Sequence, residues 1–349
     1  MKKLIAKIRR KKEVGPPSRI TNETVAEHRE RILAGGRRFK YPIQYARHRL
    51  VLNAILISIV AAILVVVISW WQLYPAQNTS VFMYSVTKIL PLPVASVDGQ
   101  PVLYSDYLMK YLGAVRFLAQ KEQISLKSAD GLRQVQYIKQ QQMQDAVADA
   151  YAIKLAKKMN LVVSDTDLAT SLKLQRQSSD GEESQQTQDA AYLDFYGWSP
   201  DEYSHVLKNT LLRQKVAYAV DNNANKLADL ISLQLKADGS NLPAIASAIN
   251  LARANTVAYG ASGLVPRGNN DGGLANQAGK LQKGQTSAVE KFTTGDGYYF
   301  VRLLDINNDQ VSYEYIQIPL TTFTKNLDKL KQDNKVNYYI SIPKTSNAQ

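Results

Sequence analysis

The 349-residue sequence predicts an α+β protein with a single N-terminal transmembrane helix, a mainly helical module, and a small α/β domain inserted before a C-terminal helix and strand. Three observations predict this organisation. One long apolar run without charges lies near the N-terminus, a series of helix-capping signals follows it, and strand-like segments occur near both ends of the remaining chain. Roughly 275 residues follow the apolar run, enough to bury a substantial hydrophobic core.

The basic character of the chain is confined to its N-terminus. Residues 1–49 contain fifteen Lys and Arg and four Glu, a net charge of +11, whereas the other 300 residues carry only about +2 of the total of +13. This distribution predicts a basic cytoplasmic tail that lies against anionic lipid headgroups, with one helix over residues 23–33 that ends at Gly35 and Gly36. Nucleic-acid binding by the tail is the alternative, but no nucleic-acid partner is expected.

Residues 50–74 are the predicted transmembrane helix. The run from Leu50 to Leu73 is 24 residues long and uncharged, which is enough to cross a bilayer. Six Lys and Arg lie in the twenty residues before it and one lies in the twenty after it, so the N-terminus is expected in the cytoplasm and the body outside, with the lipid bilayer as a partner. A cleaved signal peptide would require a shorter basic region, so we expect an uncleaved single-pass anchor in the cell membrane.

Several kinds of chemistry are not expected of this sequence. The chain has no cysteine, which removes thiol nucleophiles and cysteine-bound zinc. The exported region contains a single histidine, His205, which we interpret as a helix-face residue, and no His/Asp/Glu cluster has metal spacing. We therefore expect no metal and no cofactor.

After a short stalk predicted over residues 75–93, residues 94–220 are predicted to form the helical module. Residues 94–97 alternate like a strand and Asp98-Gly99 supplies a tight turn. The cap signals predict helices over 106–123, 128–160, 165–175 and 200–220, and the polar segment 177–189 is predicted to be a loop. The side chains expected on the buried face of the longest helix are Leu132, Val135, Met143, Val147, Tyr151 and Leu155.

Three segments of this module carry a family resemblance. They read VASVDGQPVLYSDY, AIKLAKKMNLVVSDTDL and YLDFYGWSPDEYSHVLKNTLLRQKV, in this order. Together they resemble the N-terminal domain of SurA, PrsA and PpiD-type foldases, which are extracytoplasmic or membrane-anchored. The resemblance implies a chaperone that binds unfolded or nascent exported polypeptides. It also implies that the C-terminal segment 321–349 returns as a helix and a strand to complete the module, with 338–342 paired against 94–98.

Residues 221–320 resemble a divergent parvulin-type prolyl isomerase domain. The similar segments are Gly272-Gly273-Leu274, KGQTS at 283–287 and GYYFV at 297–301, after helices expected over 225–236 and 242–250. The parvulin family usually has a histidine where this chain has Tyr299, and its first strand, which ends in another histidine, is missing before Asn225. We expect strand 311–318 to pair with 298–304 as a hairpin and to bring Tyr315 near the second histidine position.

The parvulin pocket segment is also shortened, to residues 276–279. Because the usual active-site residues are missing, whether the domain is an enzyme stays open. The hypotheses are a chaperone with a degenerate isomerase domain, an active peptidyl-prolyl cis-trans isomerase, and a non-catalytic cell-envelope adaptor. The parvulin-like positions are Tyr299, Tyr315, Gly272 and Gly273.

An aromatic cluster surrounds the cap at Ser199. Tyrosine and tryptophan provide contact area at a low cost in entropy, which suits the weak binding of unfolded segments. These side chains are therefore candidate peptide-binding residues, and the alternative is that they belong to the core of the helical module. They are Tyr192, Phe195, Tyr196, Trp198 and Tyr203.

Overall fold

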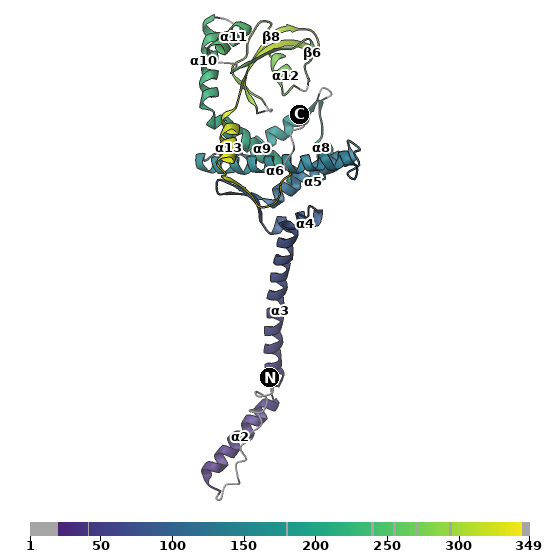
Figure 1. The fold of residues 1–349 in the computed structure, drawn as a ribbon, viewed down its shortest axis with the longest axis vertical. Coiled ribbons are helices and arrows are strands. Elements are labelled where there is room, and N and C mark those ends of the chain that lie inside the picture. Colours follow the sequence, from purple (N-terminus) through teal and green to yellow (C-terminus); the bar gives the residue numbers. More distant parts are fainter. Residues whose placement is uncertain are drawn as a thin grey trace. The chain divides into compact units, whose positions relative to one another are not determined.

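The computed structural model describes residues 20–343, except residues 41, 179–180, 239–240, 254–255, 270 and 293–294. The chain divides into two compact units, Met1–Trp70 and Trp71–Gln349. Helices and strands are mixed, as predicted, and Figure 1 labels them along the chain.

The described part of the first unit contains two helices. Helix α2 (Asn22–Lys40) continues through Gly35 and Gly36, so the predicted end at residue 33 is wrong. Helix α3 (Pro42–Leu73) includes a 26-residue apolar stretch, His48–Leu73, which spans about 39 Å at 1.5 Å per residue. Among the described residues, it is the one helix long and apolar enough to cross a membrane.

The second unit begins with the last turn of α3, which is built into the body. Leu73 is fully buried, and its carbonyl accepts a hydrogen bond of 2.8 Å from the Tyr104 hydroxyl. The Tyr74 hydroxyl donates to the carbonyl of Pro93 at 2.6 Å. The region predicted to be a stalk contains helix α4 (Val81–Ile89), whose Met83 and Thr87 are buried. This segment is therefore packed structure rather than an extended spacer.

Four helices of the module follow the predicted cap signals closely. They are α5 (Tyr104–Gln120), α6 (Ala129–Met159), α7 (Asp165–Gln175) and α9 (Pro200–Val220). Ser164 and Ser199 each form a capping box, in which the serine oxygen and a carboxylate three residues later exchange hydrogen bonds with the backbone. Helix α5 begins before Ser105, with Leu103 at the cap position. Leu132 is exposed rather than buried, because it lies in the first turn of α6 beyond the core.

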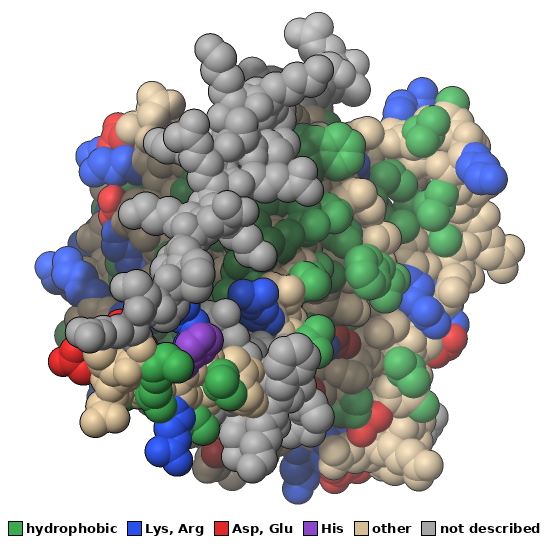
Figure 2. All heavy atoms as spheres, turned by 90° about the horizontal axis from the view of Figure 1, so that it is seen from below, with side chains coloured by type: hydrophobic (Ala, Val, Ile, Leu, Met, Phe, Trp, Pro, Cys, Tyr) green, Lys and Arg blue, Asp and Glu red, His purple; other side chains and the backbone are tan. Residues whose placement is uncertain are grey.

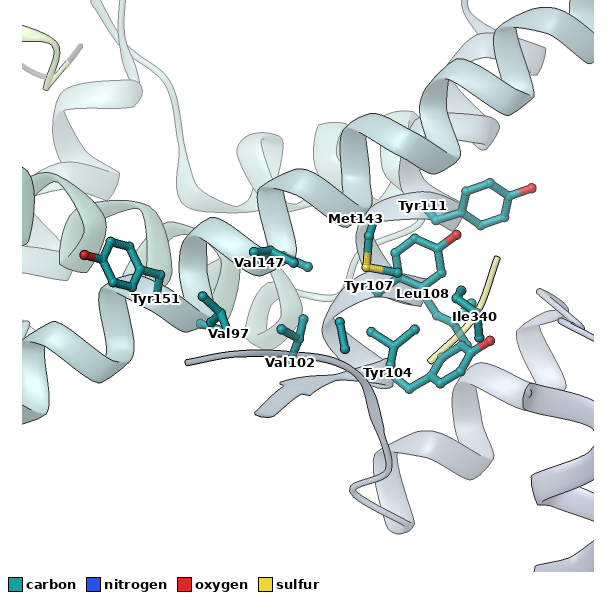
Figure 3. Packing of buried hydrophobic residues seen from close by; sticks show 14 of the residues in the cluster. Val97, Val102, Tyr104, Tyr107, Leu108, Tyr111, Met143, Val147, Tyr151 and Ile340 are labelled. Atoms are coloured by element: carbon teal, nitrogen blue, oxygen red, sulfur yellow. The ribbon is translucent and has the colours of Figure 1, made fainter. Parts of the chain in front are cut away.

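The core of this module lies between the helices and a small sheet. Figure 3 shows Tyr104, Tyr107 and Leu108 of α5 and Val97 and Val102 of the strands, with Met143 of α6 next to Tyr107. Tyr104 and Tyr107 are fully buried, with ring centroids 6.0 Å apart. Large aromatic side chains thus contribute much of the buried apolar area that stabilises the module.

The segment predicted to be a loop, residues 177–189, is partly regular structure. It contains the short hairpin β3 (Gln177–Ser178) and β4 (Gly181–Glu182) and the start of helix α8 (Gln185–Tyr196). Ser184 caps α8 by accepting a hydrogen bond of 3.1 Å from the Thr187 N–H. The prediction failed because the first turn of α8 is polar, whereas the aromatic side chains that pack it begin only at Tyr192.

The two ends of the second unit meet in one sheet, as predicted, but the returning strand is formed by residues 336–338 rather than the predicted 338–342. Strands β1 (Pro93–Val97), β2 (Gln100–Leu103) and β10 (Val336–Tyr338) form an antiparallel sheet in the order β10-β1-β2. Ala95 is opposite Tyr338, and Val97 is opposite Val336. The returning helix is α13 (Thr322–Gln332), and its Phe323 ring lies 5.2 Å from the ring of Tyr151 on α6.

An antiparallel sheet forms the centre of the inserted region. The strands β5 (Ala258–Ala261), β9 (Gln310–Pro319), β8 (Gly297–Ile306) and β7 (Glu290–Lys291) lie in this order, and β6 (Val265–Pro266) also pairs with β9. The predicted hairpin of β8 with β9 is confirmed. Helices α10 (Asn222–Asp238) and α11 (Leu242–Arg253) cover one face, and α12 (Leu274–Ala278) covers the other.

One buried carboxylate, that of Asp221, contacts both the inserted region and the helical module. Asp221 is buried at the end of α9, and its Oδ2 accepts hydrogen bonds from the backbone N–H groups of Thr321 and Thr322 at 2.8 and 2.9 Å. Its Oδ1 accepts from the N–H of Ala224 at 3.1 Å. Burial alone would raise the pKa of Asp221, but these backbone hydrogen bonds outweigh that effect and lower it. One side chain therefore caps both α10 and α13.

A network of charges lies between α5, α6 and α9. Lys110 forms ion pairs with Asp145 and Asp149, and Arg213 lies 2.5 Å from Asp145 and 3.3 Å from Asp149. The side chains of Lys110 and Asp149 are only 6% and 5% exposed. Burial raises the pKa of Asp149, and the two cations oppose this effect. Because buried charges are stabilised only when paired, the network favours one arrangement of the three helices.

Candidate peptide-binding surface

The five aromatic residues singled out in the sequence come together at the end of α8 and the start of α9. Tyr192 stacks on Tyr203 with ring centroids 3.5 Å apart, and Tyr196 stacks on Trp198 at 4.7 Å. Tyr192 and Tyr196 are 6.3 Å apart, which joins the two pairs. Phe195 contacts Tyr196 edge-on at 6.4 Å. The structure therefore brings all five into one group, which we call the aromatic cluster.

The aromatic cluster includes a sixth ring that the sequence analysis did not select. Phe117 of α5 stacks on Tyr196 at 5.6 Å and meets Phe195 edge-on at 6.4 Å. Phe117 follows Gly113, against which Trp198 packs, by four residues, so both lie on the same face of α5. The sequence pattern alone did not indicate this ring, because the contact joins segments about 80 residues apart.

Specific backbone features fix the cluster against α5. The Trp198 indole N–H donates to the carbonyl of Met109 at 3.1 Å. A Cβ at Gly113 would lie 2.8 Å from the indole nitrogen, so only glycine allows the ring to sit this close to α5. Gly197, at φ +73°, ends α8 and turns the chain toward Trp198.

One side of the cluster is covered and the other reaches solvent. Tyr203 is buried, and its hydroxyl donates to the side-chain oxygen of Gln175, as does that of Tyr192 at 3.3 Å. Phe195 is 37% exposed, and its neighbour Leu193 is also exposed. Lys121 lies 4.5 Å from the centre of the Phe195 ring and pairs with Asp194. The cluster is therefore both part of the packing and an apolar surface with a charged margin.

A polar cleft of about 350 Å³ adjoins the cluster at Met109 and Ser199. His205, predicted to be a helix-face residue, lies in its wall on α9 and pairs with Asp106 of α5 at 3.0 Å. The hydrogen bond to Asp106 raises the pKa of His205, against the opposing effect of burial. Across the cleft, the Tyr84 hydroxyl donates to Glu202 at 2.5 Å. Among the described residues, no group of three or more His, Asp or Glu side chains is placed to hold a metal ion.

The parvulin-like positions lie together in the inserted region. The rings of Tyr299 on β8 and Tyr315 on β9 are 5.9 Å apart. The Tyr299 hydroxyl donates to the carboxylate of Asp296 at 2.9 Å. Gly272 and Gly273 have positive φ angles of 76° and 108° and lead into α12. A Cβ at Gly273 would lie 3.2 Å from Phe292, whose ring is 5.2 Å from that of Tyr299, so Phe292 connects the glycine turn to the tyrosine pair.

Comparison with known proteins identifies the helical module. Residues 44–217, about half of the chain, match the family model of the SurA-like N-terminal domain. The chain therefore belongs to the family of proteins with a SurA-like N-terminal domain, and this domain indicates a chaperone-like role in the folding of exported proteins. The match ends before the inserted region. No curated protein and no solved structure matched the chain.

Proposed function

We propose that the protein is a membrane-tethered, extracytoplasmic chaperone that holds unfolded segments of exported proteins. Three observations support the proposal: the SurA-like N-terminal domain, the α3 helix that is long enough to cross a membrane, and the aromatic cluster. The basic tail is cytoplasmic and contacts anionic lipid, because Lys and Arg are concentrated on that side of α3. The body faces newly exported chains on the other side.

The aromatic cluster is the observation that carries this function. Rings that are fixed by packing but partly exposed lose little entropy when they contact a client. Phe195 and Leu193 present apolar surface. The charged side chains of Lys121 and Asp194 at its margin are hydrated and keep the protein soluble. Such a surface binds unfolded segments weakly and without a sequence code, as a holding chaperone requires.

The inserted region is, in this proposal, a parvulin-like domain that has lost isomerase activity. Tyrosines at 299 and 315 stand where the family's histidines are expected. The hydroxyl of Tyr299 is already bound to Asp296, so it is not available to orient a substrate imide. The active-isomerase hypothesis concerns the same residues. It is tested on the full chain in the exchange measurement described next.

The full chain in detergent micelles provides the test. Light scattering would follow the aggregation of a chemically unfolded client, and cis-to-trans exchange in a proline peptide would be measured in parallel. We expect slower aggregation without faster exchange. The Phe195→Ser and Tyr196→Ser double variant should lose most of the protection. The Tyr137→Ser variant, which removes an exposed tyrosine of α6 outside the cluster, should keep it.

Three results would change the proposal. Exchange well above the uncatalysed rate would show that the inserted region is an isomerase. If the wild-type chain gave no protection, the adaptor hypothesis would be favoured. If the double variant protected as well as the wild type, the aromatic cluster would be part of the core only, and clients would bind elsewhere on the chain.

A further inference from the structure

Helix α4 has one largely apolar face that no described residue of the second unit covers. Val81, Phe82 and Ile89 are 67%, 69% and 81% exposed. Together with Ser85 they form a single stripe, because these positions are three or four residues apart on the helix. Hydrophobic side chains reach the surface among charged ones in the view of Figure 2. Three large exposed apolar side chains on one face of a surface helix are more unusual than single exposed side chains.

The opposite face of α4 is fixed to the body. Met83 and Thr87 are buried, and Met83 belongs to the core of the module. The Tyr84 hydroxyl donates to Glu202 of α9, and Lys88 forms an ion pair with the same carboxylate at 3.2 Å. The exposed stripe therefore cannot turn inward without breaking these contacts.

The start of α4 is held close to the end of α3. The backbone N–H of Asn78 donates to the carbonyl of Gln72 at 2.8 Å, and the Asn78 side chain donates to the Gln72 side chain at 3.1 Å. Val81 follows Asn78 by three residues, so the Cα atoms of these two residues are at most about 11 Å apart. Trp71, in the last turn of α3, is exposed, and tryptophan at the end of a membrane span favours the headgroup level.

We infer that the exposed stripe of α4 lies in the headgroup region of the bilayer that α3 crosses, with phospholipid as its partner. This inference rests on the proposed membrane anchoring. An apolar helix face next to the end of a span enters the boundary between headgroups and acyl chains, where interfacial helices bury their apolar side. Because α4 is fixed to α9, this contact also restrains how the body, including the aromatic cluster, is oriented toward the membrane surface.

Depth measurements with spin labels test the inference in the full chain. The natural sequence has no cysteine, so single cysteines can be introduced without background. Phe82→Cys and Ile89→Cys would be labelled in vesicles of phosphatidylcholine and phosphatidylglycerol. Accessibility to oxygen, which concentrates in lipid, would be compared with accessibility to a water-soluble nickel chelate. Ala61→Cys in α3 is the control for a buried span, and Leu251→Cys on α11 is the control for an exposed apolar site in water.

We expect labels at Phe82 and Ile89 to favour oxygen over the nickel chelate several-fold more than the label at Leu251, and less than the label at Ala61. The inference is overturned if both α4 labels behave like Leu251 while Ala61 is in lipid, a result that leaves the proposed chaperone function intact. It is also overturned if the α4 labels are protected from both reagents, which would show that protein covers the stripe. A water-exposed Ala61 would overturn the anchoring as well.

Discussion

The buried pair of Lys110 and Asp149 should make Lys110→Met one of the most destabilising single changes in the module. The change preserves most of the side-chain volume but leaves Asp149, with a side chain that is 5% exposed, without its closest cation. Removing one partner of a buried ion pair costs about 3–5 kcal/mol. Arg213 remains 3.3 Å from Asp149 and compensates in part, so we expect a loss of about 3 kcal/mol.

The double variant Lys110→Met, Asp149→Leu should recover most of this loss. Replacing a whole buried pair with apolar side chains is often neutral or stabilising, because no charge remains without a partner. Asp145 keeps Arg213 in that variant. Urea unfolding of the full chain in detergent, followed by the near-ultraviolet circular dichroism of the buried tyrosines, would give the free-energy differences.

Lys121→Met is the matched control. Lys121 also pairs with an aspartate, Asp194, but both side chains of that pair are accessible to solvent. Exposed pairs contribute at most about 1 kcal/mol. A cost below about 1 kcal/mol for Lys110→Met, or a double variant no more stable than the single one, would refute the argument that the burial of Lys110 and Asp149 makes their pairing important for stability.

Three further changes test other parts of the fold. Asp221→Ala removes the cap of both α10 and α13 and should cost about 2–4 kcal/mol in urea unfolding, and a cost below about 1 kcal/mol would contradict the shared cap. His205 has a raised pKa in the folded chain, so its stabilisation by Asp106 should be complete below the ordinary value of 6.5 and be lost as the pH rises through the folded pKa. The melting temperature should therefore fall over that range in the wild type and not in His205→Gln, and equal profiles would refute the pairing. Gly113→Ala should displace Trp198 and shift its fluorescence to longer wavelength in a chain whose other tryptophans are phenylalanine, and an unchanged spectrum would contradict the close packing.

Local signals in the sequence predicted much of the fold. The Ser199 cap followed by Pro200 fixed the start of α9 at the observed residue. The return of the chain end to the first strand was also predicted, but the residues that pair with 95–97 are 336–338 rather than 338–342. The predicted grouping of Tyr192 to Tyr203 agrees with the stacked rings.

The remaining features depend on contacts between distant segments, which periodicity does not show. Helix α8 begins in a polar stretch and packs against the Phe117 ring of α5, so its composition alone indicated a loop. Lys110 lies on a helix that the sequence marks only as amphipathic, and its burial depends on acids 35 and 39 residues away. Helix α4 follows a tryptophan- and proline-containing segment, and its packing depends on Glu202 on α9.

Contact between the aromatic cluster and an unfolded client is the most direct test of the proposed chaperone function. A photo-crosslinking amino acid would be placed at Phe195 in the full chain, and at Leu251 as an exposed position outside the cluster. With a chemically unfolded client, we predict strong crosslinking at position 195 and little at position 251, and loss of the 195 product when the client is folded. Equal crosslinking at both positions, or none at 195, would contradict the account.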